Sequence, residues 1–143
     1  LNDDGHPLRV KLTPVATFSA RAITDWARTT LAPGTTVFSD GLACFRAVTA
    51  AGCAHKPTVI AGRKPSQVPE FQWINTVLGN LKTSLSGCYH AFRFRKYAAR
   101  YLAAFAYRFN RRFDLAALPE RLLVAAARCA PQPQRIIRAE AHC

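Results

Sequence analysis

The first 62 residues alternate between short extended patterns and longer patterns with helical spacing. Positions 8–18 alternate apolar and polar side chains, which predicts a strand. Positions 19–34 repeat apolar residues at helical intervals behind Ser19, a candidate N-cap, and Pro33-Gly34 ends the run. Three more elements are predicted: a strand at 35–40, a helix at 42–52 closed by Gly52, and a strand centred on Thr58, Val59 and Ile60.

This order of strands and helices is typical of a parallel sheet with crossover helices. A loop rich in Pro and charge at 63–70 separates it from a pattern that is helical from Phe71 to about Cys129, with breaks at Gly87 and near 113–120. We therefore predict an α/β portion in residues 1–62 and a helical portion in residues 71–143. The length of 143 residues indicates that both belong to one domain.

The predicted helix that begins at Phe71 has two faces. Because a helix turns about 100° per residue, Asn75 and Lys82 share one stripe with Gly79 between them. A different stripe is apolar and suited to pack on a sheet; it consists of Trp73, Val77, Leu81 and Leu85.

A second helix is predicted over positions 93–112, a stretch without a single acidic residue. Arg93, Lys96 and Arg100 share one of its faces, and Arg108, Arg111 and Arg112 gather at its end. One explanation of this pattern is contact with DNA phosphates. The alternative is a solvated helix face whose last arginines complement the helix dipole. The opposite face is apolar: Ala98, Leu102, Phe105 and Phe109.

Charge is distributed unevenly along the chain, whose formal net charge is +12. Six basic and four acidic residues precede Gly62, whereas fourteen basic and four acidic residues follow from Gly62 onward. This excess predicts a polyanionic partner for the second half, with nucleic acid first and an anionic membrane surface second. A basic protein without such a partner is the alternative. No apolar run approaches the ~20 residues that a membrane-spanning helix needs.

The five cysteines show no C-x-x-C pair and no zinc-ligand spacing. We expect reduced thiols in a cytosol, with Cys44, Cys53 and Cys129 as small core residues. The more specific candidate chemistry lies at Asp40, just past a predicted parallel strand, where open α/β sheets bind ligands and metals. Its carboxylate and the amide oxygen of Asn75 can both coordinate Mg²⁺, which prefers hard oxygen ligands. An ordinary solvated helix face is the alternative explanation for Asn75.

Four segments, VFSDGLACF (37–45), WINTVLGNLK (73–82), GCYH (87–90) and AFAYRFNRR (104–112), occur in an order that resembles a known family. The resemblance is to the catalytic domain of bacterial insertion-sequence transposases of the DDE superfamily, in the group whose third catalytic position can be Asn followed seven residues later by Lys. It covers nearly all of positions 6–143. It implies a ribonuclease-H-like mixed sheet with flanking helices, lacking its first strands, plus a helical C-terminal region.

The resemblance implies roles for individual residues. Asp40 matches the second catalytic aspartate, Asn75 matches the third catalytic position, and both would hold metal. His55 matches a recurrent histidine for which the residues indicate no role. The resemblance and the basic pattern together assign DNA contact to Lys82, His90, Arg93, Lys96, Arg100, Arg111 and Arg112, with Tyr89 beside His90 in the segment that closes the catalytic helix.

The resemblance further implies two divalent ions, Mg²⁺ or Mn²⁺, that promote in-line phosphoryl transfer between DNA strands. The family's first catalytic aspartate has no match here, and the chain has no Met. We therefore expect an amino-terminally truncated transposase domain that binds Mg²⁺ weakly and is inactive alone. DNA is the expected partner, no membrane is involved, and the resemblance allows a homo-oligomer on DNA. The expected location is cytoplasmic, with the nucleoid.

Two other functions fit the residues less fully. A non-catalytic basic nucleic-acid-binding module, or a decayed transposase remnant, would explain the charge without any chemistry. A small metal-dependent nuclease of the same fold would need a second carboxylate near Asp40, and the sequence offers no good one.

Overall fold

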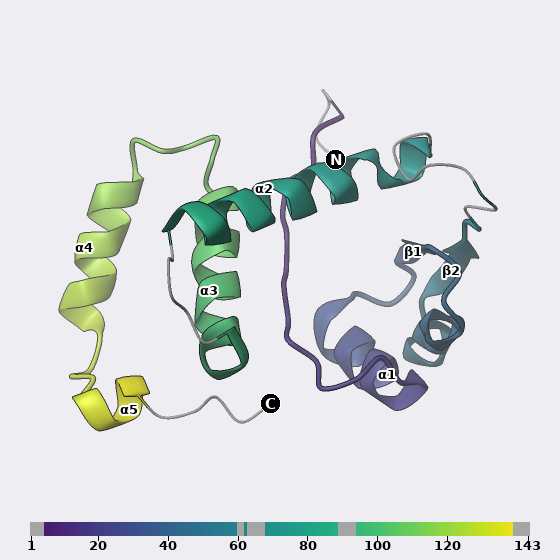
Figure 1. Ribbon diagram of the computed structural model, residues 1–143, viewed down its shortest axis with the longest axis horizontal. Helices are drawn as coiled ribbons and strands as arrows, with labels where there is room; N and C mark the ends of the chain where they lie inside the picture. The colour runs from purple at the N-terminus through teal and green to yellow at the C-terminus, as the bar shows by residue number, and fades with distance from the viewer. Residues whose placement is uncertain (1–4, 60–61, 63–67, 89–93, 139–143) are drawn as a thin grey trace. The chain divides into compact units, whose positions relative to one another are not determined.

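The computed structural model describes residues 5–59, 62, 68–88 and 94–138. They form a mixed α/β structure in which helices dominate (Figure 1). The chain divides into two compact units: one is Val15–Leu78, and the other combines Leu1–Pro14 with Gly79–Cys143. Helix α2 (Gln72–Cys88) contributes its first half to the former and its second half to the latter.

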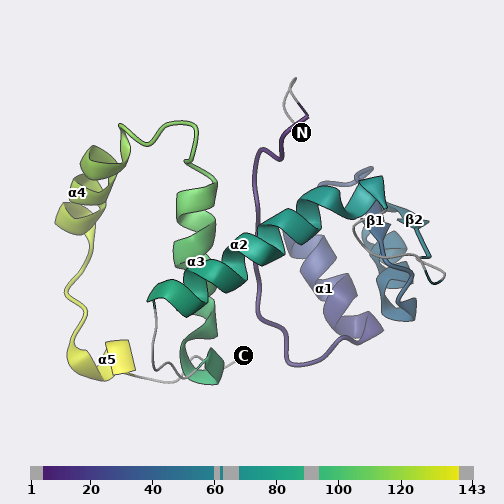
Figure 2. The same ribbon diagram turned by 45° about the horizontal axis from the view of Figure 1, so that its top comes forward.

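The Val15–Leu78 unit is built around a pair of parallel strands, β1 (Thr36–Ser39) and β2 (Ala54–Pro57) (Figures 1 and 2). Their register places Thr36 opposite Ala54 and Ser39 opposite Pro57. A 3-10 helix, η1 (Ala43–Ala51), makes the crossover between them. The predicted parallel pairing is therefore confirmed for these two strands.

Helix α1 (Ala20–Thr30) packs against η1 and supplies the core of this unit. As predicted, Ser19 caps it, because the Ala22 amide donates to Ser19 Oγ at 3.2 Å. The central side chains are Ile23, Ala27, Val48 and Cys53, all buried. A second 3-10 helix, η3 (Pro69–Phe71), leads into α2, and Phe71 and Val77 are buried there.

The second unit contains the end of α2, then α3 (Phe94–Phe109), α4 (Leu118–Arg128) and α5 (Gln134–Arg138). The predicted apolar face of α3 is confirmed, since Ala98, Leu102 and Phe105 are buried. The rings of Phe105 and Phe109 stack with centroids 6.0 Å apart. In contrast, α4 buries no residue.

The extended segment before α1 belongs to this second unit as far as Pro14. The Asn110 side chain holds it with two hydrogen bonds: the Val10 amide donates to Asn110 Oδ1 at 2.7 Å, and Asn110 Nδ2 donates to the Val10 carbonyl at 3.0 Å. Arg112 adds a hydrogen bond to the Pro7 carbonyl. An asparagine side chain thus gives Val10 the two hydrogen bonds that a neighbouring strand would otherwise provide.

Several predicted elements differ from the structure. Positions 8–18 form no strand, because the backbone at Val10 pairs with a side chain and not with another strand. Of the three predicted strands, two are present among the described residues. The one expected around Thr58 lies instead at Ala54–Pro57, where pairing with β1 sets its register, and Ile60 lies outside the described residues.

The remaining differences are smaller. The helix predicted at 42–52 is of the 3-10 type and ends at Gly52 as expected, in a left-handed conformation with φ of 78°. Helix α2 continues through Gly87 to Cys88. Cys53 is buried as predicted, but Cys129 is exposed because it follows α4, a helix that buries nothing.

Candidate active site and basic surface

Asp40 follows β1 directly and lies in a tight turn. Its Oδ1 accepts a hydrogen bond from the Leu42 amide at 3.2 Å. Between them, Gly41 has φ of +87°, and a Cβ at this position would come within 3.2 Å of Val59 Cγ2. The positive φ favours glycine at this position, and the approach to Val59 leaves little room for a larger residue. The turn presents an exposed carboxylate at the carboxyl end of a parallel strand, the position that open α/β sheets use for ligands.

The residue before Asp40 anchors the end of β1. Ser39 is buried, and its Oγ lies 2.9 Å from His55 Nε2 on the neighbouring strand. The Gly41 amide also donates to Ser39 Oγ, at 3.4 Å. His55 thus ties β2 to the turn that carries Asp40, which provides a structural role for a histidine whose function the sequence did not indicate.

Replacing His55 with alanine is expected to lower the free energy of unfolding by about 1 kcal/mol, because the buried Ser39 hydroxyl loses a hydrogen-bond partner. Urea unfolding of His55→Ala, Ser39→Ala and the double variant measures this as a coupling between the two positions. Purely additive losses would mean that the two side chains do not stabilise each other.

Asn75 lies on α2 and is half-buried, within the same Val15–Leu78 unit as Asp40. Helix α2 also carries Lys82, seven residues further on and exposed, as the two-faced pattern predicted. Its apolar stripe is confirmed, with Val77 and Leu81 buried. Two predicted site residues, His90 and Arg93, lie outside the described residues.

The basic residues of α3 make contacts within the protein. Lys96 Nζ and the Arg100 guanidinium lie 5.5 and 5.7 Å from the Tyr97 ring centroid. Arg100 also donates to the Ile136 carbonyl at 3.0 Å and to the Ile137 carbonyl, which ties α3 to α5. Arg108, which the sequence placed only in a general basic cluster, donates to Ser84 on α2 at 3.0 Å.

Arg111 and Arg112 are half-buried and stacked on aromatic rings. The Arg111 guanidinium lies 3.7 Å from the Tyr107 ring centroid, and that of Arg112 lies 3.9 Å from the Phe109 ring centroid. Together with Asn110, Arg112 binds the extended amino-terminal segment. The sequence did not reveal this structural role, because the partners are about 100 positions away along the chain.

Comparison with known families decides the identity of the chain. A family model described as the ISXO2-like transposase domain matches residues 1–110. The chain belongs to this transposase family. No curated protein and no solved structure matches it.

Membership in the ISXO2-like transposase family confirms the resemblance to insertion-sequence transposases and assigns the chain to DNA transposition. Throughout the described ranges, no three His, Cys, Asp or Glu side chains gather closely enough to hold a metal ion. In the same ranges, no helix has the length and apolar character needed to cross a membrane.

Proposed function

We propose that this chain forms part of the catalytic domain of a DDE-type transposase, which cuts DNA at the ends of an insertion sequence and joins it to a target. The observation that carries the proposal is the Asp40 turn, in which an exposed carboxylate follows a parallel strand in a chain of this family. Both compact units would be parts of this one catalytic domain.

Asp40 and Asn75 are the residues we propose as metal ligands. A carboxylate and an amide carbonyl are both hard oxygen donors that suit Mg²⁺ or Mn²⁺. Such an ion supplies the positive charge that activates an attacking oxygen and stabilises a leaving oxygen in phosphoryl transfer. The neutral Asn75 contributes less electrostatic attraction than a carboxylate would, so we expect weak binding of the ion.

The basic residues that we propose as DNA contacts differ in whether their side chains already make contacts within the protein. Lys82 is exposed on α2, and Lys96 is half-buried beside Tyr97, so the ammonium groups of both can reach phosphates. Arg100 and Arg112 already bind backbone carbonyls, and their contribution to DNA binding would come from the remaining donors of each guanidinium. His90 and Arg93 remain proposals from the resemblance and the basic pattern of the sequence.

A non-catalytic DNA-binding role is the second candidate. It is favoured by one observation, namely the charge from Gly62 onward, where fourteen basic residues stand against four acidic ones. The two candidates differ in their need for a metal ion. The deciding experiment is Mn²⁺-dependent strand cleavage of DNA that carries the element's terminal repeats, compared with the Asp40→Ala variant.

A further inference from the structure

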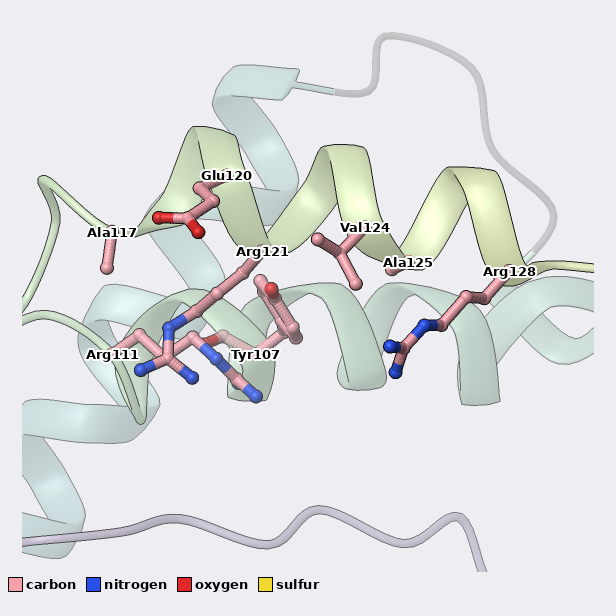
Figure 3. Close-up of a pocket in the computed structure, with 8 residues that line it drawn as sticks. All are labelled: Tyr107, Arg111, Ala117, Glu120, Arg121, Val124, Ala125 and Arg128. Atoms are coloured by element: carbon pink, nitrogen blue, oxygen red, sulfur yellow. The ribbon is translucent and has the colours of Figure 1, made fainter.

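A pocket of about 510 Å³ lies between the end of α3 and one face of α4 (Figure 3). Three arginines line it, and α4 contributes two of them. Its lining has a clear excess of positive charge, because Glu120 is the one acidic residue among the lining side chains. The residues that matter here are Tyr107, Arg111, Glu120, Arg121 and Arg128.

Arg111 is held rigidly at this pocket. Its guanidinium stacks 3.7 Å from the Tyr107 ring centroid, and Nη1 donates to the Tyr107 carbonyl at 3.3 Å. Its Nε, in contrast, is buried and has no hydrogen-bond partner among the residues that the structure describes. The stacking and the hydrogen bond fix the guanidinium at the pocket, where its positive charge can attract an anion.

The two α4 arginines lie on the same stripe of the helix. Arg121 and Arg128 are seven residues apart, which is two turns and roughly 10 Å along the axis. Figure 3 shows both side chains extending from α4 towards α3. Arg121 also approaches Asp114 at 3.6 Å, but both side chains are more than half exposed, so this ion pair is weak.

A second pocket, of about 410 Å³, shares Arg111 and Arg121 with the first. Arg9, Asn110 and Asp114 line it as well, so that its three arginines stand against one carboxylate and the surface continues towards the amino-terminal segment. Arg9, Arg111, Arg121 and Arg128 thus line two adjoining pockets. Free phosphate would engage only one position of this surface, whereas DNA phosphates follow one another at about 3.4 Å of axis per strand.

We propose that these adjoining pockets bind phosphates along one strand of a DNA backbone, with Arg111, Arg121 and Arg128 as the phosphate ligands. The inference rests on the proposed function as a DNA transposase. It adds a DNA contact on α4, which lies beyond the residues 1–110 matched by the family model. Arg111 donates from a fixed guanidinium, while the exposed arginines of α4 extend the contact along the strand.

The test measures DNA affinity of the full 143-residue chain against salt concentration, using a double-stranded oligonucleotide. For the Arg121→Gln/Arg128→Gln pair, we expect the slope of log affinity against log salt to fall by roughly 1.8, because each lost phosphate contact removes about 0.9. The matched control is Arg28→Gln/Arg46→Gln, which removes the same charge from exposed positions outside the pockets and should leave the slope nearly unchanged.

A second variant tests the role of Arg111. Arg111→Lys keeps the charge but removes the planar guanidinium that stacks on Tyr107, and we expect roughly tenfold weaker DNA binding at fixed salt. Circular dichroism establishes whether each variant folds. If Arg111→Lys does not fold, the Arg121→Gln/Arg128→Gln variant still tests the proposal.

The outcomes separate the two proposals. An unchanged slope for the α4 pair, or equal losses in the α4 pair and the control pair, would overturn the pockets as a phosphate site while DNA binding by the chain still stands. Failure of the unaltered chain to bind any DNA would overturn both this inference and the proposed function. A slope that falls for the α4 pair alone supports the site.

Discussion

Replacing Asp40 with alanine is expected to slow Mn²⁺-dependent DNA strand cleavage by roughly a thousandfold, because a metal ion contributes several kcal/mol to stabilising the charged transition state. Asp40 is the one charged metal ligand that we propose, and the turn after β1 holds its carboxylate in place. Its removal would leave Asn75, a neutral side chain, as the remaining proposed ligand. The measurement is cleavage by the full product of the reading frame that encodes this chain, on DNA that carries the terminal repeats.

Asp25→Ala is the matched control for this experiment. Asp25 is an exposed aspartate on α1, paired with Arg21 at 4.0 Å, and its loss removes the same charge from the Val15–Leu78 unit. We expect cleavage by Asp25→Ala to stay within about threefold of the unaltered protein, since an exposed pair contributes little. Equal activity of Asp40→Ala and Asp25→Ala would contradict a catalytic role for Asp40 and favour the non-catalytic DNA-binding protein.

The Asn110→Ala variant is expected to lose about 2 kcal/mol of unfolding free energy. The substitution removes both hydrogen bonds between Asn110 and Val10, at 2.7 and 3.0 Å, and each contributes roughly 1 kcal/mol. The extended segment would then be held less tightly, although Arg112 would still donate to the Pro7 carbonyl. Urea denaturation followed by circular dichroism provides the free energy directly.

Two comparisons make the Asn110 result specific. Asn80→Ala removes an exposed asparagine from α2 and should change the unfolding free energy by less than about 0.5 kcal/mol. Asn110→Asp keeps the oxygen that accepts from the Val10 amide but loses the donor to its carbonyl, so we expect an intermediate loss. A loss for Asn110→Ala no larger than that for Asn80→Ala would show that the segment is not held by this side chain.

The parts of the fold that follow local rules could be predicted from the sequence. Helix α1 begins at the cap that Ser19 provides and ends before Pro33-Gly34, and both signals lie within a few residues of the helix. The faces of α2 and α3 follow from helical periodicity alone, which depends on nothing distant.

The misplaced strands depended on distant partners. The amino-terminal segment alternates as a strand does, yet its observed hydrogen bonds at Val10 go to a side chain 100 residues away. The third strand was predicted around the β-branched residues Thr58, Val59 and Ile60. Strand β2 lies upstream of them because pairing with β1 sets its position. Periodicity within a segment contains no information about which group will form hydrogen bonds with its backbone amides and carbonyls.

The candidate site was predictable only where it depends on local signals in the sequence. Asp40 was located by its position after a strand, which is a local signal. The contact between Ser39 and His55 depends on the register of two strands and was not foreseen. In the basic region, sequence alone does not separate an arginine that binds phosphate from one, like Arg112, that binds a backbone carbonyl of its own chain.

The most direct test asks whether Asp40 and Asn75 bind the same cation. Mn²⁺ added below one equivalent broadens the NMR signals of nuclei close to its binding site. We expect the Gly41 amide and the Asn75 side-chain amide to broaden together, and both effects to disappear in Asp40→Ala. Broadening at Gly41 with an unaffected Asn75, or broadening at Asn75 that persists in Asp40→Ala, would contradict a shared metal site.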